Sequence, residues 1–301
     1  MNRINRIFIM IQKKIKNMKV IILGSKGMLG KALQKEFSDF EIFCFDKEDL
    51  DITNENNLKE KIKEIRPEVV INATAINAVD KIEIEASFYK LAEEINGTVV
   101  GKLAEICKDL DIILVHYSSD YVFKGDNSAG YKEDVYIDPI NKYGETKVLG
   151  EKLLKLTTDK FYLIRLSRLF GLAGESAMTK KSFVDIMLDL VINKNKKELD
   201  LVDDEKSCPT YAPDLAKFTK KLIEEKKPFG IYHGANSGVC TWYEFAKEIF
   251  KIKNLVVKCN SVSADKFPRP AKRPNFSELI NTKVDKQRNW QEALREYLEN
   301  N

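Results

Sequence analysis

The chain has 301 residues, 44% of them hydrophobic and 32% charged, which is typical of a globular protein large enough for one α/β unit or two modest domains. Fifty Lys and Arg against 46 Asp and Glu give a net charge of +4, too slight an excess to indicate nucleic acid or an anionic membrane as a partner. Five cysteines at long spacings and only two histidines disfavour a disulfide framework or a Cys/His zinc site, so we expect a reducing, cytoplasmic compartment and no metal.

The first 17 residues are basic and precede the first clear strand. Their apolar run Ile7–Ile11 is too short for the core of a signal peptide. No stretch of the chain reaches the ~18 apolar residues that a membrane span needs. Because Met18 stands directly before the strand, we interpret residues 1–17 as a misassigned start or a disordered basic tail.

Short apolar runs alternate with helical patterns from residue 18 to residue 168. Strands are expected at Lys19–Leu23, Glu41–Phe45, Val69–Ile71, Ile112–His116 and Phe161–Arg165. Helices are expected up to Phe37, at Asn56–Ile65, at Phe88–Asp109 and from Asn141 onwards. This alternation predicts an α/β fold in which residues 18–168 form a Rossmann-type, doubly wound parallel sheet with right-handed crossovers.

The pattern changes after residue 168, which predicts a smaller C-terminal substrate-binding lobe at residues 169–301. Helices are expected at Met178–Val191, Asp214–Glu225 and Trp242–Phe250, the last of them capped by Thr241. Two further segments are expected to be extended or irregular, namely Leu201–Tyr211 and the proline-rich Phe267–Asn275. Residues 213–235 are expected to return to the Rossmann domain.

Gly24, Gly27 and Gly30 follow the first strand and open the first helix. Glycines permit the tight turn and let the backbone approach a pyrophosphate, and the helix N-terminus offers free N–H groups. Asp46 ends the next strand, where a carboxylate can bind the adenosine ribose. This context predicts a dinucleotide site, although a glycine-rich turn without a ligand has the same local pattern.

The cofactor is expected to be NADPH or NADH, with a slight preference for NADH. Asp46 favours the free ribose hydroxyls of NADH, whereas Lys26 and Lys47 could hold the 2′-phosphate of NADPH. Asp51 and Ile52 lie where the chain that leaves the second strand can border the adenine. The alternative for Asp51 is a cap of a helix or turn.

Tyr143 and Lys147 stand four residues apart in a predicted helix, so their side chains lie on one face, one turn apart. A neighbouring ammonium favours the phenolate and lowers the pKa of a tyrosine from its usual ~10, which makes the phenol usable as an acid or base. Taken alone, the pair has an ordinary alternative, a solvated helix turn that happens to carry both residues.

In order along the chain, several motifs resemble those of extended short-chain dehydrogenases/reductases, and more narrowly the dTDP-4-dehydrorhamnose reductase family. They are the glycine loop, Asn72–Ala75, Val79–Glu83, His116–Phe123, Tyr143–Lys147, Cys208–Thr210, Gly230–His233 and Arg273–Ser277. The resemblance covers nearly all of the chain from Met18 to about Lys283. It implies an NAD(P)H-dependent reductase of a nucleotide-linked 4-keto-6-deoxysugar, most directly one that makes dTDP-L-rhamnose for cell-wall polysaccharide.

The resemblance also implies roles for single residues. Tyr143 corresponds to the proton donor, Lys147 to the residue that lowers its pKa and binds the nicotinamide ribose, and Ser119 to the hydroxyl on the reacting oxygen. Without Tyr143, a strand-end hydroxyl bonded to the backbone would be the better interpretation of Ser119. Asp120 corresponds to a substrate contact, and Asn96 to an asparagine behind the lysine. The remaining cofactor contacts correspond to Met28, Leu29, Ala75, Ile76, Asn77 and Tyr117.

Two departures from the family pattern leave the sugar open. Arg168 stands where the family often has a Trp after the fifth strand, and the segment Gly171–Lys181 is unusual as well. Arg168 could bind an acidic sugar or a phosphate, or it could be a solvated or structurally paired arginine. Arg273, in the proline-rich loop, is the stronger candidate for a diphosphate contact. For Lys180 and Lys181 a solvated basic face is the better interpretation.

Two other functions stay open. An epimerase or dehydratase of the same superfamily would recycle tightly held NAD(P)⁺, although Ser119-Asp120 is followed by Tyr121 and not by the acid that a dehydratase needs. A non-catalytic NADP-binding regulatory subunit, like the β subunit of methionine adenosyltransferase, would bind a partner enzyme, but the set Ser119, Tyr143 and Lys147 argues against it. The expected partner is a nucleotide-sugar substrate, without nucleic acid or membrane, and a homodimer is left open.

Overall fold

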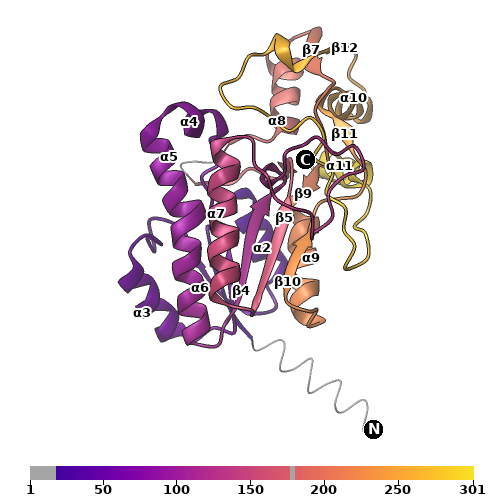
Figure 1. Ribbon diagram of the computed structural model, residues 1–301. Helices are drawn as coiled ribbons and strands as arrows, with labels where there is room; N and C mark the ends of the chain where they lie inside the picture. Colours follow the sequence, from indigo (N-terminus) through magenta and orange to yellow (C-terminus); the bar gives the residue numbers. More distant parts are fainter. Residues whose placement is uncertain (1–17, 177–179) are drawn as a thin grey trace, which may run out of the picture.

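The computed structural model describes residues 18–176 and 180–301 and contains a six-stranded parallel sheet with helices on both faces (Figure 1). The strand order is β10-β5-β4-β3-β1-β2. The strands are β1 (Lys19–Leu23), β2 (Glu41–Phe45), β3 (Val69–Asn72), β4 (Ile113–Ser119), β5 (Phe161–Leu166) and β10 (Gly230–His233). The prediction of a doubly wound α/β fold is confirmed, whereas residues 1–17 and Met178 lie outside the described residues.

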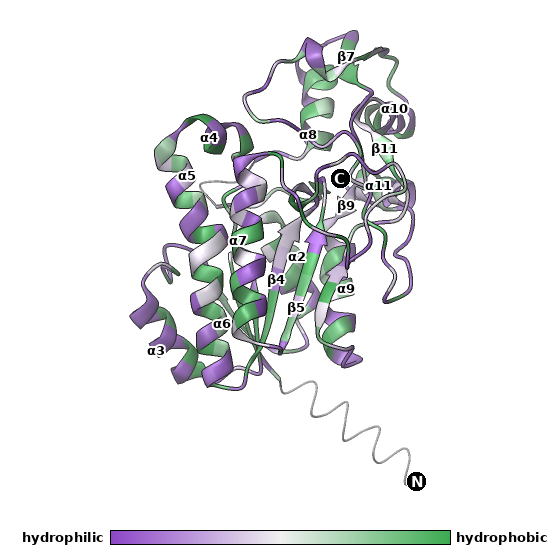
Figure 2. Cartoon of the chain, viewed as in Figure 1, coloured by the Kyte–Doolittle hydropathy of each residue, from purple (hydrophilic) through white to green (hydrophobic). Residues whose placement is uncertain are grey.

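The side chains of each strand alternate between two hydrophobic layers. On β1, Ile21 and Leu23 face one layer and Val20 and Ile22 the other, and all four are buried. The first layer is covered by α3 (Glu55–Ile65), α6 (Val99–Asp109) and α7 (Lys142–Thr157), and the second by α2 (Met28–Glu36) and α9 (Ala212–Glu224). Figure 2 shows apolar and polar residues alternating along α3 and α6, as expected for helices with one buried side.

Two expectations for this layer need correction. The helix expected at Phe88–Asp109 is instead divided into α5 (Ala86–Glu93), a π turn at Glu94–Thr98 and α6. The division was not predicted because the apolar pattern of the sequence continues through the π turn. The fourth strand does not end at His116 but runs on to Ser119. Although Tyr117, Ser118 and Ser119 are polar, they are buried and continue the pairing with β5.

The lobe has its own apolar core around α8 (Phe183–Leu188), α10 (Trp242–Ile252) and α11 (Trp290–Glu299). The helix expected at Met178–Val191 contains α8, which begins only after Ser182 has capped it, and then a π turn at Asp189–Asn193. The predicted Thr241 cap of α10 is confirmed, since Thr241 Oγ1 accepts a hydrogen bond from the Glu244 N–H. Beside these helices lies a parallel pair, β7 (Glu198–Val202) and β12 (Lys258–Val262).

Several short elements connect the lobe to the sheet layer. Residues 212–233 supply α9 and the edge strand β10, which pairs with β5. The segment expected to be extended at Leu201–Tyr211 contains the two-residue strands β8 (Lys206–Ser207) and β9 (Thr210–Tyr211), which pair with β11 (Cys240–Thr241) and β6 (Leu169–Phe170). The remaining short helices are α4 (Val79–Ile84), η2 (Asp120–Val122) and η4 (Ala264–Lys266).

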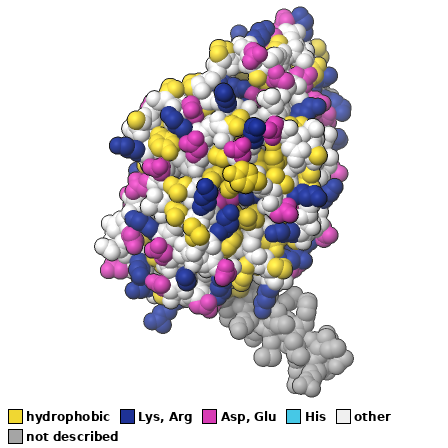
Figure 3. Space-filling view, in the orientation of Figure 1, with side chains coloured by type: hydrophobic (Ala, Val, Ile, Leu, Met, Phe, Trp, Pro, Cys, Tyr) yellow, Lys and Arg dark blue, Asp and Glu magenta, His cyan; other side chains and the backbone are white. Residues whose placement is uncertain are grey.

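The surface is consistent with the balanced composition. On the face seen in Figure 3, basic and acidic side chains intermingle over both the sheet layer and the lobe. Within the described ranges, no helix combines the length and the apolar character needed to cross a membrane.

Candidate active site

A cavity of about 760 Å³ lies at the carboxyl ends of the sheet strands, lined by both the sheet layer and the lobe. It begins where the strand order reverses, with β2 on one side of β1 and β3 on the other, which is the usual ligand position in an open α/β sheet. It brings together most of the predicted site residues: Gly24, Gly27, Met28, Leu29, Asp46, Asp51, Ile52, Ala75, Ile76, Asn77, Tyr117, Ser119, Asp120, Tyr143, Lys147, Arg168 and Arg273.

The glycine loop owes its shape to contacts that only glycine permits. Gly24 has φ +77°, and a Cβ there would lie 3.0 Å from the backbone of Ala73 and Thr74 at the end of β3. A Cβ at Gly30 would lie 2.2 Å from the carbonyl oxygen of Gly24. Gly30 is not among the lining residues, and the absence of a side chain there lets α2 approach the loop. The expected cofactor contact of Gly30 stays a prediction.

At the predicted adenosine end of the cavity, the carboxylates of Asp46 and Asp51 accept hydrogen bonds that fix the local backbone. Asp46 Oδ2 accepts a hydrogen bond from the Lys26 N–H and Oδ1 from the Lys47 N–H, each at 2.9 Å. The Lys26 ammonium pairs with Glu48 at 2.9 Å. Asp51 Oδ1 accepts hydrogen bonds from the N–H and the hydroxyl of Thr53, which lower the pKa of Asp51. Asp51 therefore caps a turn while it borders the cavity.

These features fit a nicotinamide dinucleotide. The loop from Gly24 to Gly27 forms a cradle beside the N-terminus of α2, and Gly27 N-caps that helix without a side chain. An acid closes the strand next to the loop, and a Tyr and a Lys lie further along the same cavity. The described residues hold no cluster of His, Cys, Asp or Glu that could bind a metal ion.

Tyr143 lies in the first turn of α7, which begins at Lys142 because Asn141 caps it through a 2.8 Å bond to the Gly144 N–H. Gly144 allows the helix to pack closely, since a Cβ there would lie 2.3 Å from the carbonyl oxygen of Tyr121. Burial raises the pKa of Tyr143, and a hydrogen bond with Ser119 opposes the shift. Desolvation is the larger influence, so the pKa of Tyr143 is raised and not lowered as expected from Lys147.

Lys147 is 2% exposed, one turn further along α7. Its ammonium donates a 2.7 Å hydrogen bond to the carbonyl oxygen of Tyr117. Burial lowers the pKa of Lys147 to about 8, and the carboxylate of Glu151 opposes the shift. A lysine with this pKa can change its charge near neutral pH, which is unusual for the residue type.

Asn96 ties the cofactor side of the cavity to α7 from within the π turn. Its Oδ1 accepts a hydrogen bond from the Ile76 N–H at 2.9 Å, and its Nδ2 donates to the Ile76 carbonyl at 2.9 Å and to Thr146 Oγ1 at 3.0 Å. Thr146 directly precedes Lys147. The expected place of Asn96 behind the lysine is what the structure shows, and π turns are often found at such functional positions.

Tyr117 borders the cavity, but its phenol hydroxyl is bonded to a residue on the other side of the sheet. The hydroxyl lies 2.7 Å from Thr219 Oγ1 on α9, within the hydrophobic layer behind the sheet. The backbone of Tyr117 also takes part in the site, because its carbonyl oxygen accepts the hydrogen bond of Lys147, and the expected cofactor contact of Tyr117 stays a prediction.

Ser119 and Asp120 form the centre of a buried polar cluster. The Ser119 hydroxyl donates to Asp120 Oδ1 at 3.1 Å, and Oδ2 accepts from the hydroxyls of Ser207 at 3.1 Å and Ser277 at 2.6 Å. Burial raises the pKa of Asp120, and the three hydroxyls oppose it. Ser207 and Ser277 were missed from the sequence. Ser277 ends one of the quoted motifs and Ser207 precedes another, so each had a neighbouring signal.

Arg168 is paired within the protein. Its guanidinium donates to the carbonyl oxygens of Cys240 and Glu205, each at 2.7 Å, and lies over the ring of Trp242 at 4.0 Å from the centroid. The Trp242 indole N–H in turn donates to the Glu205 carboxylate at 3.2 Å. Of the two interpretations of Arg168, the structure matches the structurally paired one. Glu205 and Trp242 also line the cavity and had not been predicted there.

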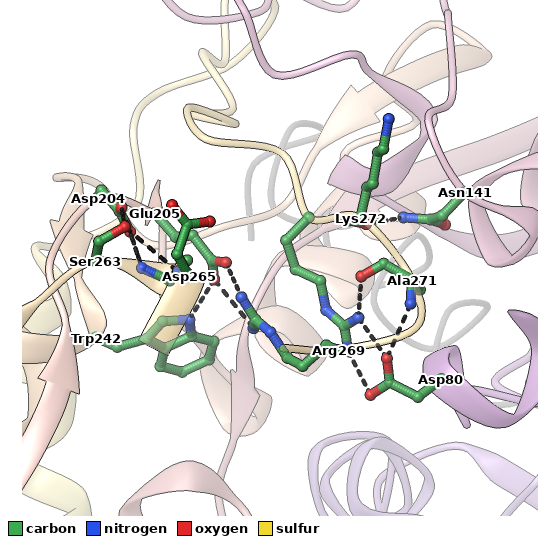
Figure 4. Close-up of polar contacts among 12 residues, drawn as sticks. Asp80, Asn141, Asp204, Glu205, Trp242, Ser263, Asp265, Arg269, Ala271 and Lys272 are labelled. Carbon is green, nitrogen blue, oxygen red and sulfur yellow. Dashed lines mark hydrogen bonds and ion pairs between the residues drawn. The ribbon is translucent and has the colours of Figure 1, made fainter. Parts of the chain in front are cut away.

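A proline-rich loop crosses from the lobe to the sheet layer beside this cluster (Figure 4). Arg269 pairs with Glu205 at one end, and Arg273 forms two hydrogen bonds with Asp80 of α4 at the other, at 2.6 and 2.7 Å. Asn141, the cap of α7, donates to the carbonyl of Lys272 between them. Arg273 thus borders the cavity while its guanidinium is engaged by a carboxylate.

The two lysines of the unusual segment also border the cavity. The Lys180 ammonium donates to the carbonyl oxygen of Asn77 at 3.1 Å, and that of Lys181 lies 3.9 Å from Asp189. The same segment packs on the glycine loop, because a Cβ at Gly174 would lie 2.5 Å from the Lys26 carbonyl oxygen. The segment therefore covers the loop at its Lys26 side.

Comparison with known proteins shows the family to which the chain is related. The family model of the RmlD substrate binding domain matches residues 18–301. The chain is 35% identical to the spore coat polysaccharide biosynthesis protein SpsK of Bacillus subtilis, over 93% of this chain and 97% of that protein. It is 33% identical to the dTDP-4-dehydrorhamnose reductase of Escherichia coli, over 87% of this chain and 89% of that protein.

Solved structures agree with this assignment. A dTDP-4-dehydrorhamnose reductase of Clostridium acetobutylicum has 37% identity and a TM-score of 0.86, covering 94% of this chain and 99% of that one. The corresponding protein of Bacillus anthracis, solved in complex with NADP, has 35% identity and a TM-score of 0.87, covering 95% and 100%. A UDP-glucose 4-epimerase of Thermus thermophilus, at 17% identity and a TM-score of 0.74, shares the fold.

Proposed function

The chain belongs to the dTDP-4-dehydrorhamnose reductase family, and from this premise we propose that it reduces dTDP-4-dehydro-L-rhamnose to dTDP-L-rhamnose. It is an NAD(P)H-dependent oxidoreductase that acts on a nucleotide sugar. One observation carries the finer proposal. Ser119 from β4 and Tyr143 and Lys147 from α7 converge in a single cavity that starts at the glycine loop and ends in the lobe. We propose the cytoplasm as the place of this reaction.

The cofactor would lie along the sheet end of the cavity. Gly24 and Gly27 with the N-terminus of α2 would hold the pyrophosphate, Asp46 the adenosine ribose, and Lys147 the nicotinamide ribose. Bound NAD(P)H supplies a hydride to the carbonyl carbon of the sugar. Asn96 would keep Ile76 and α7 at a fixed separation across this end of the cavity.

Tyr143 and Ser119 would act on the carbonyl oxygen. Negative charge develops on that oxygen during reduction, and two hydroxyl donors fixed by β4 and α7 stabilise it without reorganising. Tyr143 then delivers its proton to the oxygen, as expected for a phenol that burial keeps protonated. The Lys147 ammonium, one helical turn away, favours the resulting phenolate.

The lobe would hold the sugar nucleotide. Asp120, fixed by three serine hydroxyls, offers a carboxylate beside Ser119 for the sugar hydroxyls. Arg273 and Lys180 are the cations nearest to a diphosphate position, because both border the cavity between α4 and the proline-rich loop. Arg168 and Trp242 would form the wall behind the sugar.

A substrate panel tests the proposal. NADPH and NADH oxidation would be followed against dTDP-4-dehydro-L-rhamnose and against dTDP-, UDP- and GDP-linked ketosugars, with products identified by mass spectrometry. We expect one NAD(P)H consumed for each dTDP-L-rhamnose formed. Formation of an isomer or a dehydrated sugar without net consumption would identify an epimerase or dehydratase. Failure to consume NAD(P)H with any of these sugars would reject the reductase.

A further inference from the structure

A chain of hydrogen bonds beneath the cavity fixes the orientation of His116. Asn72 Oδ1 accepts from both the N–H and the hydroxyl of Thr74, at 3.1 and 2.5 Å. Two donors on one atom identify that atom as the amide oxygen, so the Asn72 amide nitrogen is the group that faces His116 Nδ1 at 3.2 Å. Because an amide N–H₂ can only donate, Nδ1 of His116 must accept.

The proton of His116 therefore sits on Nε2. The ring is fully buried, and burial together with the charge of Lys147 holds the pKa of His116 well below its usual value, so the ring is neutral and carries one proton. Its Nε2 lies 3.5 Å from the Nζ of Lys147. An ammonium has three donors and no acceptor, so a charged Lys147 cannot form a hydrogen bond with this N–H.

We propose that His116 is a positioning residue for Lys147, and that its Nε2–H, locked by Asn72 and Thr74, favours the neutral amine over the ammonium. The neutral amine can accept the Nε2–H through its lone pair. The ammonium instead has to turn its N–H groups away from the ring, toward the carbonyl of Tyr117 and toward the cavity. The direction toward the cavity is the one in which the proposed function needs a donor from Lys147.

The charged group that opposes the proposed effect of His116 on Lys147 is Glu151, and it is itself neutralised by an arginine. On α7, Glu151 lies one turn beyond Lys147 and favours the ammonium, but Arg165 of β5 binds both oxygens of Glu151, at 2.9 and 2.7 Å. Burial and Glu151 are the two influences that shift the pKa of Lys147. Of the other polar groups on the neighbouring elements, Asn72 of β3 and Asn96 of the π turn are uncharged, Tyr143 lies one turn before Lys147 on α7, and Asp120 belongs to η2.

The other histidine of the chain is a built-in control. His233 Nδ1 lies 3.1 Å from the carbonyl oxygen of Ile280, which can only accept, so His233 carries its proton on Nδ1. Burial lowers the pKa of His233 to about 3. The two histidines are thus expected to be neutral and to adopt opposite tautomers.

Nitrogen NMR on the whole chain tests this without substrate. In protein labelled with ¹⁵N-histidine, long-range ¹H–¹⁵N correlation should show one ring protonated at Nε2 and one at Nδ1, neither titrating between about pH 6 and pH 9. His233→Gln should remove the Nδ1–H pattern and so assign the other ring. An Nδ1–H pattern or a titrating ring for His116 would overturn the proposal, whether or not the proposed reductase activity is found.

The pH profile tests the effect on Lys147. In His116→Gln the amide can turn its oxygen toward Nζ, which favours the ammonium, so the alkaline limb of kcat/KM should move up by about one pH unit. Asn72→Asp places a carboxylate that accepts a hydrogen bond from Nδ1–H, which moves the ring proton to Nδ1 and leaves Nε2 as an acceptor. This variant should move the limb in the same direction and convert His116 to the Nδ1–H pattern. His233→Gln, the same change at the other ring, should leave the limb in place. An unmoved limb in folded His116→Gln and Asn72→Asp would refute the role.

Discussion

The two ends of the cavity that we propose to hold the cofactor and the sugar nucleotide, called here the cofactor end and the sugar end, are built in different ways. At the cofactor end, the contacts that shape the site join residues close in sequence or main-chain atoms, such as the Lys26 N–H and Asp46, 20 residues apart. At the sugar end, they join side chains that are far apart in sequence: Ser277 and Asp120 are 157 residues apart, and Arg273 and Asp80 are 193 residues apart. The first end depends on the shape of the backbone, and the second on pairs that exist only when the whole chain has folded.

The difference determines how each end responds to substitution. A change at the cofactor end acts by adding or removing atoms next to a fixed backbone, so its cost follows from steric overlap. A change at the sugar end leaves a buried partner without its hydrogen bond, so its cost follows from the group left behind. Four sets of variants separate the two ends, in order of decreasing expected effect.

Tyr143→Phe removes the proposed proton donor, which lies where the two ends meet. We expect kcat to fall by about 10²–10⁴-fold, because general acid catalysis of this kind contributes that much. The NADPH dissociation constant, measured by fluorescence, should stay nearly unchanged, since the phenyl ring remains in place. A variant with near-normal kcat would exclude Tyr143 from proton transfer.

Gly30→Ala and Gly27→Ala break the cofactor end in two distinguishable ways. The Gly30 Cβ would meet backbone at 2.2 Å, so overpacking should cost about 1–3 kcal/mol, lowering both Tm and NADPH affinity. The Gly27 Cβ would have its nearest neighbour at 3.3 Å and should weaken NADPH binding with little change in Tm. Thermal unfolding and isothermal titration on both variants measure this. Equal Tm losses would show that Gly27 also serves packing.

Arg168→Lys probes the sugar end. A lysine cannot bond both carbonyls and cover Trp242, so about 1–3 kcal/mol of interaction is lost, and we expect KM for the sugar nucleotide to rise about tenfold. NADPH affinity should not change. Arg295→Lys, the same substitution at an exposed position of α11, is the matched control. A loss of NADPH affinity in Arg168→Lys would place this residue at the cofactor end instead.

Asp80→Asn and Arg273→Lys test whether Arg273 reaches the substrate or only anchors the loop. The pair is partly exposed, with 40% of the Asp80 side chain accessible, so each substitution should raise KM only a few-fold. If Arg273 only anchors the loop, both variants and their combination should show the same KM. A larger effect of Arg273→Lys than of Asp80→Asn would indicate direct contact with the diphosphate.

The sequence predicts the cofactor end better than the sugar end, for a physical reason. The bounds of β1 and β2 were predicted without error, because each is a short apolar run between turn residues, although β1 is buried and the edge strand β2 is only partly so. Ser119, Tyr143 and Lys147 lie in one cavity, as the helical spacing of Tyr143 and Lys147 and the family resemblance for Ser119 suggested. Their catalytic roles remain predictions.

The same reasoning explains what was missed. Glu205 and Trp242 belong to no local pattern that predicts a site, and they line the cavity only through the way the lobe packs on the sheet. The pairing of Arg168 with two backbone carbonyls could not be read from its neighbours, because Glu205 and Cys240 are 37 and 72 residues away. The packing of Gly30 against Gly24 could not be predicted from the sequence, because it depends on the geometry of the folded loop.

The π turn at Glu94–Thr98 sets the phase of one helix against another. Each α-helical residue advances the chain by about 100°, so deleting Gly97 and restoring a continuous α-helix would rotate all of α6 by that angle relative to α5. Leu103 and Ile106, now buried, would turn away from the sheet. A single uninterrupted α-helix could direct either these apolar residues toward the sheet or Asn96 toward Ile76. The extra residue of the π turn allows both orientations in one continuous helical segment.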